Sequence, residues 1–298
     1  MKIKIFTTYK PGTWDNYSKR GIESIAKNFP AEVDIVVYAE EPKPECKYDR
    51  ITWIDLNSAE PELFKFKNKY KNDPIANGGL QEIEGGVRRP AELKTKGGKD
   101  ATKGSYLWAA VRFANKVFCV VNAVRNSAEY DYVVWIDADT YTFRQMPIKF
   151  LEDLLPLNTM LTYLGRERFE LNDGGKYPEC GFVGYNLRHP EIQNFVKDWE
   201  QLYVTDNVFK LLEWHDSFVF WHLSKLFRKE KNIEVNDIGY ASGVRGHHVF
   251  VNSELGLYMD HMKGKRKQQG TSAKKDLRPP RADAPADVSK IDYWKNRP

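Results

Sequence analysis

An apolar run that ends in two aspartates constrains the fold of this chain more than any other feature. Residues Tyr132 to Ile136 are all aromatic, β-branched or otherwise apolar, and their number suits a strand that is buried on both faces. Asp137 and Asp139 follow the run directly and are separated by Ala138. Ligands of open α/β sheets bind at the carboxyl ends of the strands, and residues i and i+2 of an extended segment point the same way. We therefore expect the two carboxylates to converge at a ligand site.

Two convergent carboxylates repel each other unless a cation lies between them. Because a hard divalent ion such as Mn²⁺ or Mg²⁺ suits oxygen ligands, the pair Asp137 and Asp139 predicts a metal site. The alternative interpretation is structural: Asp137 caps the end of the strand, and Asp139 begins the next turn. The pair on its own leaves both interpretations open.

The segments on either side of this run predict an α/β fold with a mostly parallel central sheet flanked by helices. Alternating apolar residues, helical periodicity and turn residues divide the chain into a rhythm of strands and helices that is typical of parallel sheets. The expected strands are residues 2–8, 32–38, 50–56, 132–136, 160–164 and 182–187. The expected helices are residues 17–28, 106–125, 146–155 and 216–228 and one opened by Pro190, whereas 235–251 is expected to be irregular.

The length of 298 residues suits one large α/β domain, which we place at residues 1–267. Residues 68–104 interrupt its rhythm with many Gly and Lys residues. We interpret them as a long mobile insertion, an internal loop that is either functional, such as a lid, or a disordered excursion. Residues 268–298 are expected to form an irregular, basic, Pro-rich tail that wraps the surface or is disordered.

The charge and cysteine patterns narrow the class of protein. The formal net charge is +5, yet residues 263–298 hold 11 Lys and Arg against 4 Asp and Glu, so the body is slightly acidic. The tail has little aromatic interleaving before Tyr293, which argues against nucleic-acid binding. Three widely spaced cysteines indicate no disulfide framework. With neither a signal peptide nor 18 consecutive apolar residues, we predict no membrane span and a cytoplasmic protein.

A histidine followed by a basic run, from His261 to Lys267, is the second constellation that could carry chemistry. A neutral imidazole can complete a site with two carboxylates and gives the mixed nitrogen and oxygen ligation that suits Mn²⁺. Gly264 allows the backbone to approach a ligand closely, and Lys265 and Lys267 supply positive charge for an anionic group such as a diphosphate. The alternative is a basic surface tail with a chance histidine.

The order of these two motifs resembles that of the metal-dependent GT-A glycosyltransferases. A strand ending in Asp-x-Asp, followed about 120 residues later by His-x-x-Gly-x-x-Lys, is most similar to the pattern of family 8, the glycogenin-like enzymes. The resemblance covers about residues 3–267 and implies a Rossmann-like GT-A fold in which His261 joins Asp137 and Asp139 on Mn²⁺ or Mg²⁺. It further implies a leaving nucleoside diphosphate that is held near the metal by Ala138, Gly264, Lys265 and Lys267.

The same resemblance suggests Asp216, His215 and Glu179 as candidate catalytic residues. The segment Glu213 to Ser217 is similar to the Trp-His-Asp-Glu segment of the blood-group-type transferases, and Glu179 opens a segment that resembles the small-residue strand beside the donor sugar. Asp216 is the candidate acid/base group; the alternative is that it serves only as the N-cap of a helix. Ser217 stands where the blood-group pattern has a glutamate, so both retention and inversion remain open.

Residues at the nucleotide end follow from the same resemblance. Enzymes of the GT-A type use the loop after the first strand for the base and ribose, which implies roles for Thr7, Thr8 and Tyr9. Tyr9 would stack on the base, or alternatively pack on the surface as an ordinary loop tyrosine. Lys116, on the polar side of the helix 106–125, would lie near the donor sugar, or alternatively belong to a solvated helix face.

The function predicted from the sequence is transfer of a sugar from a nucleotide-diphosphate sugar, most consistent with a UDP-sugar, to a hydroxyl of a glycan or glycoconjugate. A protein that binds a nucleotide sugar or glycan without turnover is the alternative, because Ser217 departs from the blood-group pattern. Phosphatases of the haloacid-dehalogenase type also use Asp-x-Asp after a strand. Their motif requires Thr or Val where this chain has Tyr141, and it lies near the N-terminus rather than in mid-chain.

Overall fold

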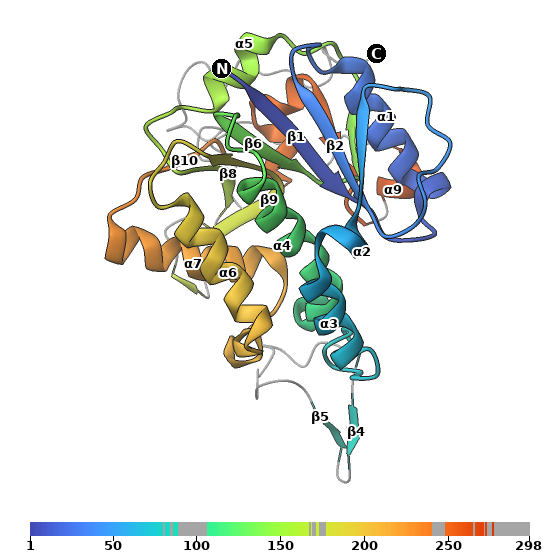
Figure 1. Cartoon of the computed structure of the whole chain (residues 1–298), viewed down its shortest axis with the longest axis vertical. Coiled ribbons are helices and arrows are strands. Elements are labelled where there is room, and N and C mark those ends of the chain that lie inside the picture. The colour runs from blue at the N-terminus through green and yellow to red at the C-terminus, as the bar shows by residue number, and fades with distance from the viewer. Residues whose placement is uncertain are drawn as a thin grey trace.

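The centre of the structure, a computed structural model, is a seven-stranded sheet (Figure 1). The structure describes residues 1–79, 81–83, 86–88, 106–166, 168, 171–172, 177–239, 248–264, 266–270, 272 and 276. The strands are, in spatial order, β10 (Val235–Asp237), β8 (Leu161–Arg166), β9 (Tyr177–Asn186), β6 (Tyr132–Ile136), β1 (Ile3–Thr8), β2 (Asp34–Ala39) and β3 (Ile51–Asp55). β9 is antiparallel to β6 and β8, and the other neighbours pair in parallel. The predicted α/β fold with a mostly parallel sheet is confirmed.

Helices cover both faces of this sheet. The helices that pack on one face are α1 (Lys19–Asn28), α5 (Ile148–Leu154) and α8 (Val249–Asn252). Those on the other face are α3 (Pro61–Tyr70), α4 (Ala110–Arg125), α6 (Ile192–Val204) and α7 (Asp216–Lys231), of which α4, α6 and α7 lie below the strands in the view of Figure 1. The shorter helical segments are η1 (Trp14–Ser18), α2 (Leu56–Ala59), η4 (Asn207–Lys210), η6 (Glu254–Leu257) and α9 (Arg266–Gln269).

The central strand β6 is apolar throughout because each of its faces meets a layer of helices. Tyr132, Val134 and Ile136 belong to the core on the α1 side, whereas Val133 and Trp135 belong to the core on the α4 side. All five are at most 3% exposed. Full burial of one such side chain stabilises the folded state by about 1.5–3 kcal/mol. The burial of β6 therefore fixes the position from which the following turn begins.

Two small antiparallel sheets complete the described strands. β7 (Thr140–Thr142) pairs with β11 (Met259–His261) and ties a late segment of the chain to the turn after β6. β4 (Gln81–Ile83) pairs with β5 (Gly86–Arg88) in a hairpin that projects past α3, away from the central sheet (Figure 1).

Several boundaries differ from those predicted from the sequence. The helix predicted to begin at Tyr106 begins at Ala110, because residues 106–108 form a tight turn in which the Trp108 indole donates to the Leu212 carbonyl oxygen at 3.2 Å. β9 begins at Tyr177 rather than at residue 182. Residues 235–251 are not irregular throughout, since they contain β10 and the first three residues of α8. Strands of three residues, such as β7 and β10, are too short to show a periodicity.

The predicted insertion and tail are described only in part. Residues 68–70 are the last turn of α3, and residues 81–83 and 86–88 are the strands β4 and β5. The rest of the predicted insertion from residue 80 onward lies outside the described residues. Within the predicted tail, residues 268–270, 272 and 276 are described. The remainder of the tail lies outside the described residues.

Candidate metal centre

The turn that follows β6 is held in place from two sides. On one side, the Asp137 backbone N–H donates to the Gly181 carbonyl oxygen of β9 at 3.0 Å, and the Thr140 N–H closes the turn on the Asp137 carbonyl oxygen at 2.9 Å. On the other side, α1 approaches so closely that a Cβ on Gly21 would lie 2.2 Å from the Ala138 carbonyl oxygen. The position of Asp137 is thus fixed by β9, and the turn is fixed by α1.

β11 brings His261 beside this turn from a distant part of the chain. In the antiparallel β7/β11 pair His261 lies opposite Thr140, and the Met262 N–H donates to the Asp139 carbonyl oxygen at 2.9 Å. The imidazole packs on Phe250 with ring centroids 5.4 Å apart. The short ladder therefore sets the histidine at the same sheet edge as the two aspartates.

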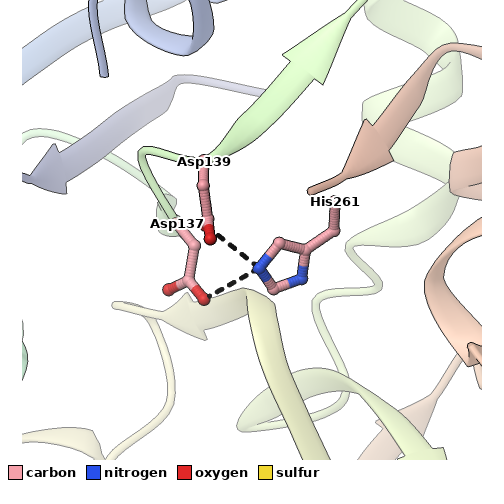
Figure 2. Close-up of side chains that lie close together, drawn as sticks. All are labelled: Asp137, Asp139 and His261. Atoms are coloured by element: carbon pink, nitrogen blue, oxygen red, sulfur yellow. Dashed lines mark hydrogen bonds and ion pairs between the residues drawn. The ribbon is translucent and has the colours of Figure 1, made fainter. Parts of the chain in front are cut away.

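Figure 2 shows the side chains of Asp137, Asp139 and His261 converging on one point. His261 Nε2 lies 3.2 Å from Asp137 Oδ2 and 3.1 Å from Asp139 Oδ1. One ligand atom from each residue can be chosen so that all three lie within 4.8 Å of one another. Two carboxylate oxygens and one imidazole nitrogen form a donor set that suits a divalent ion. The group could therefore bind a metal ion, as the sequence predicts.

Each of the two carboxylates forms an ion pair with a different lysine. Lys267 Nζ lies 2.9 Å from Asp139 Oδ2, and Lys116 Nζ lies 3.1 Å from Asp137 Oδ1. Burial raises the pKa of Asp139, but the charges of His261 and Lys267 outweigh burial and hold this pKa below its ordinary value. Burial lowers the pKa of His261, yet the charges of Asp139 and other carboxylates raise it well above its ordinary value. A bound cation would compete with these positive groups for the same carboxylates.

Lys116 lies inside the protein and not on a solvated helix face, so that alternative interpretation of the sequence is wrong for this residue. It is 6% exposed, and its ammonium group lies 2.8 Å from Asp216 Oδ2 as well as beside Asp137. It also donates to the Cys180 carbonyl oxygen and sits 4.8 Å from the centroid of the Trp135 ring. Lys116 thus links Asp137, a candidate metal ligand, to the candidate acid/base residue.

Asp216 is the first residue of α7, and the N-cap is His215, so the alternative that Asp216 acts only as the N-cap is wrong. His215 Nε2 lies 2.9 Å from Glu213 Oε2 and 3.2 Å from the Tyr177 hydroxyl. Asp216 is 8% exposed. Burial raises its pKa, but the Lys116 ammonium and His215 outweigh burial and hold the pKa of Asp216 far below its ordinary value.

The basic run after His261 is described in part. Gly264 has a φ of +58°, a left-handed backbone conformation that favours glycine. Lys265 lies outside the described residues. Lys267 packs 4.1 Å from the centroid of the Tyr17 ring and lines an open pocket beside Asp139.

Thr7 and Thr8 are the last residues of β1, and Tyr9 follows them, so two of these three residues lie in the strand and not in the loop after it. Thr7 is 1% exposed, and the Thr8 hydroxyl donates to a backbone carbonyl of β2 at 2.7 Å. Tyr9 is 4% exposed and packs against Trp14 and Trp53, with ring centroids 5.4 and 6.5 Å away. The role of these residues in nucleotide binding stays a prediction.

Three residues at this site were not singled out from the sequence. The Trp135 indole donates to Asp137 Oδ1 at 2.6 Å, and Lys263 forms an ion pair with Glu179. Gly181 makes room for His261, because a Cβ there would lie 2.3 Å from Nδ1. Each of these residues lies inside a segment that the sequence analysis discusses, but none was given a role at the site. Their partners, however, come from other parts of the chain.

No protein-family model matches the chain, and no curated protein matches it. Within the described ranges, no helix is both long enough and apolar enough to cross a membrane.

Proposed function

We propose that this protein is a metal-dependent glycosyltransferase with a GT-A fold that uses a nucleotide-diphosphate sugar, with a UDP-sugar as the first candidate donor. The observation that carries the proposal is the convergence of Asp137, Asp139 and His261 at the carboxyl end of the central strand. Ligands of α/β sheets bind at this end of the strands. The order of motifs along the sequence, which resembles that of GT-A enzymes, gives independent support.

The donor half of the reaction would use the charges around this group. Asp137, Asp139 and His261 would hold Mn²⁺ or Mg²⁺, which as a Lewis acid neutralises the negative charge that develops on a leaving diphosphate. Lys267, whose ammonium group lies 2.9 Å from Asp139 Oδ2, would add a fixed positive charge for the same diphosphate. Because it is 26% exposed along its side chain, this lysine can reach a ligand without unfolding the segment that carries it.

The acceptor half would use Asp216. Lys116 contacts both Asp137 and Asp216, so the candidate metal ligand and the candidate acid/base group share one ammonium group. An ionised Asp216 would accept a hydrogen bond from the attacking hydroxyl of a glycan or glycoconjugate and orient it toward the donor sugar. His215, which contacts Glu213 and Tyr177, would hold the first turn of α7, and with it Asp216, in a fixed position.

A second candidate function is binding of a nucleotide sugar without turnover. One observation favours it: the buried carboxylates of Asp216 and Glu179 are both paired with lysines, and Ser217 stands beside Asp216. A carboxylate that is paired with a lysine and has a lowered pKa is a weak base. Donor hydrolysis or transfer would therefore be absent in such a protein, although the donor would still bind.

Calorimetric titration of UDP-sugars and GDP-sugars, with and without Mn²⁺, tests the proposal. We expect binding that requires Mn²⁺, that is lost in Asp139→Ala, and that is unchanged in Asp153→Ala, whose carboxylate pairs with Lys149 on the surface. Failure of every nucleotide sugar to bind with Mn²⁺ present, or equal binding by Asp139→Ala, would refute it. Mn²⁺-dependent hydrolysis of the bound donor then separates the transferase from the binding protein.

A further inference from the structure

Glu179 is a buried carboxylate that faces the candidate metal ligand His261 from the side opposite the two aspartates. It is 3% exposed, and its Oε1 lies 3.3 Å from His261 Nδ1. Its Oε2 accepts from the Gly181 backbone N–H at 3.3 Å, and Lys263 pairs with Oε1. Glu179 therefore has no free oxygen directed at solvent, where a substrate would bind.

The two nitrogens of His261 have different surroundings. Nε2 faces Asp137 and Asp139, which makes it the nitrogen that a metal would take. Nδ1 is buried and makes no aligned hydrogen bond to any described residue, although Glu179 Oε1 is 3.3 Å away. A small rotation of the ring or the carboxylate would therefore complete a hydrogen bond between them, because the distance already permits one.

A histidine that gives one nitrogen to a metal needs its proton on the other nitrogen, and an acceptor facing that nitrogen fixes both the tautomer and the orientation of the ring. We propose that Glu179 is a positioning residue that holds the His261 ring with Nε2 directed at the metal. The inference rests on the metal site of the proposed function. It assigns Glu179 a role through His261 rather than the direct catalytic role suggested by the resemblance.

The local chain geometry is built around this contact. Glu179 and Gly181 lie two residues apart in β9, and both lie against His261, so the carboxylate reaches the imidazole while the glycine leaves space for the ring. The Lys263 backbone N–H donates to the His261 carbonyl oxygen at 2.9 Å. The same short segment thus supplies the imidazole and the cation that neutralises Glu179.

The test compares two replacements of Glu179 with a replacement of Glu200, a glutamate in a similar ion pair with Arg125. Glu179→Gln keeps an oxygen acceptor for Nδ1, whereas Glu179→Met fills the space without one. Glu200→Met is the control: Glu200 is also a buried glutamate, and its partner Arg125 has a side-chain exposure of 40%, the same as Lys263. In both Met variants the unpaired cation can turn to solvent, so neither leaves a buried charge behind.

Titration with MnCl₂ alone, followed by calorimetry and by Mn²⁺ electron paramagnetic resonance, is the measurement. Glu179→Met should weaken Mn²⁺ binding by about 10–100-fold, Glu179→Gln by clearly less, and Glu200→Met not at all. Equal Mn²⁺ affinity of Glu179→Met and the wild type would overturn the inference. So would an equal loss in Glu179→Gln and Glu179→Met, because rescue by the retained acceptor is the mark of a positioning role.

Two outcomes separate this inference from the proposed function. If wild-type protein does not bind Mn²⁺, the metal site itself is refuted, and the inference falls with it. If the wild type binds Mn²⁺ and Glu179→Met does so equally well, only the role of Glu179 is refuted. Should Glu179→Met fail to fold in a thermal unfolding experiment, Glu179→Ala takes its place, since it also lacks an acceptor for Nδ1. Mn²⁺ affinity of Glu179→Ala equal to that of the wild type would again overturn the inference.

Discussion

Gly181→Ala is the substitution whose effect can be worked out most directly from the structure. A Cβ at residue 181 would lie 2.3 Å from His261 Nδ1 and 2.5 Å from Cε1. Ordinary contact begins at 3.4 Å, so the imidazole must retreat by about 1.1 Å from the added methyl group, or β9 must move by the same amount. Metal–ligand distances tolerate only about 0.2 Å, so a displacement of this size removes Nε2 from a shared metal.

The expected magnitude follows from the loss of one ligand out of three. We expect Mn²⁺ affinity to fall by about 100-fold or more, which corresponds to about 2.7 kcal/mol of binding free energy. Overpacking should also destabilise the metal-free protein by about 1–3 kcal/mol. For a protein of this size that is a drop of a few degrees, roughly 2–4 °C per kcal/mol, in the temperature of thermal unfolding.

Gly184→Ala is the matched control in the same strand. Its Cβ would lie 2.5 Å from Leu155 Cδ2, the end of a flexible side chain, and not near His261. Isothermal titration with MnCl₂ and thermal unfolding by circular dichroism should show destabilisation in both variants but loss of Mn²⁺ binding only in Gly181→Ala. A folded Gly181→Ala protein that binds Mn²⁺ within about threefold of the wild type would refute the expected displacement of a metal-bound His261.

Three further predictions address the groups around this site. Lys116→Met leaves Asp137 and Asp216 without their shared cation. In urea unfolding of the metal-free protein, it should lower the free energy of unfolding by about 3 kcal/mol. A loss below about 1 kcal/mol would contradict a stabilising role of these two ion pairs. Burial raises the pKa of Glu213, but hydrogen bonds from Arg168 and His215 lower it to about 2, below its ordinary 4.5. Its contribution of about 3 kcal/mol is therefore present above pH 4.5 and lost as the pH falls toward 2, so unfolding of Glu213→Gln should differ from the wild type at pH 6 and converge with it at low pH. Asp216→Asn should lower sugar transfer by about 10²–10⁴-fold with donor affinity unchanged in calorimetry; full activity would exclude Asp216 as the acid/base group.

The parts of the fold with strong local signals are predictable from the sequence. The run from Tyr132 to Ile136 predicts a buried strand because both of its faces meet helices, and the structure confirms it as β6. The antiparallel direction of β9 leaves no such signal, since an apolar strand reads the same in either direction. β7 and β10 are missed because three residues are too few to alternate.

The candidate site shows the same division. The apolar strand before Asp137 is enough to predict that Asp137 and Asp139 lie in a turn at its end. The position of His261 beside them depends on the β7/β11 pairing, which only the order of motifs along the sequence suggests. Lys116 is placed on the polar side of its helix by periodicity, yet it is buried. Helical periodicity treats a lysine as a surface residue, but Asp137 and Asp216 compensate its charge from other elements.

The β7/β11 ladder joins two distant segments of the chain at the candidate metal centre. Asp139 and His261 are 122 residues apart, so a chain cut between β10 and α8 would leave the two aspartates on one fragment and the histidine on the other. A metal that binds only the associated fragments would stabilise their complex. At a free metal concentration of 100 times the dissociation constant, it would favour association by about 2.7 kcal/mol. Reconstitution of the centre from two pieces would then turn metal binding into a reporter of how the last part of this chain docks onto the first.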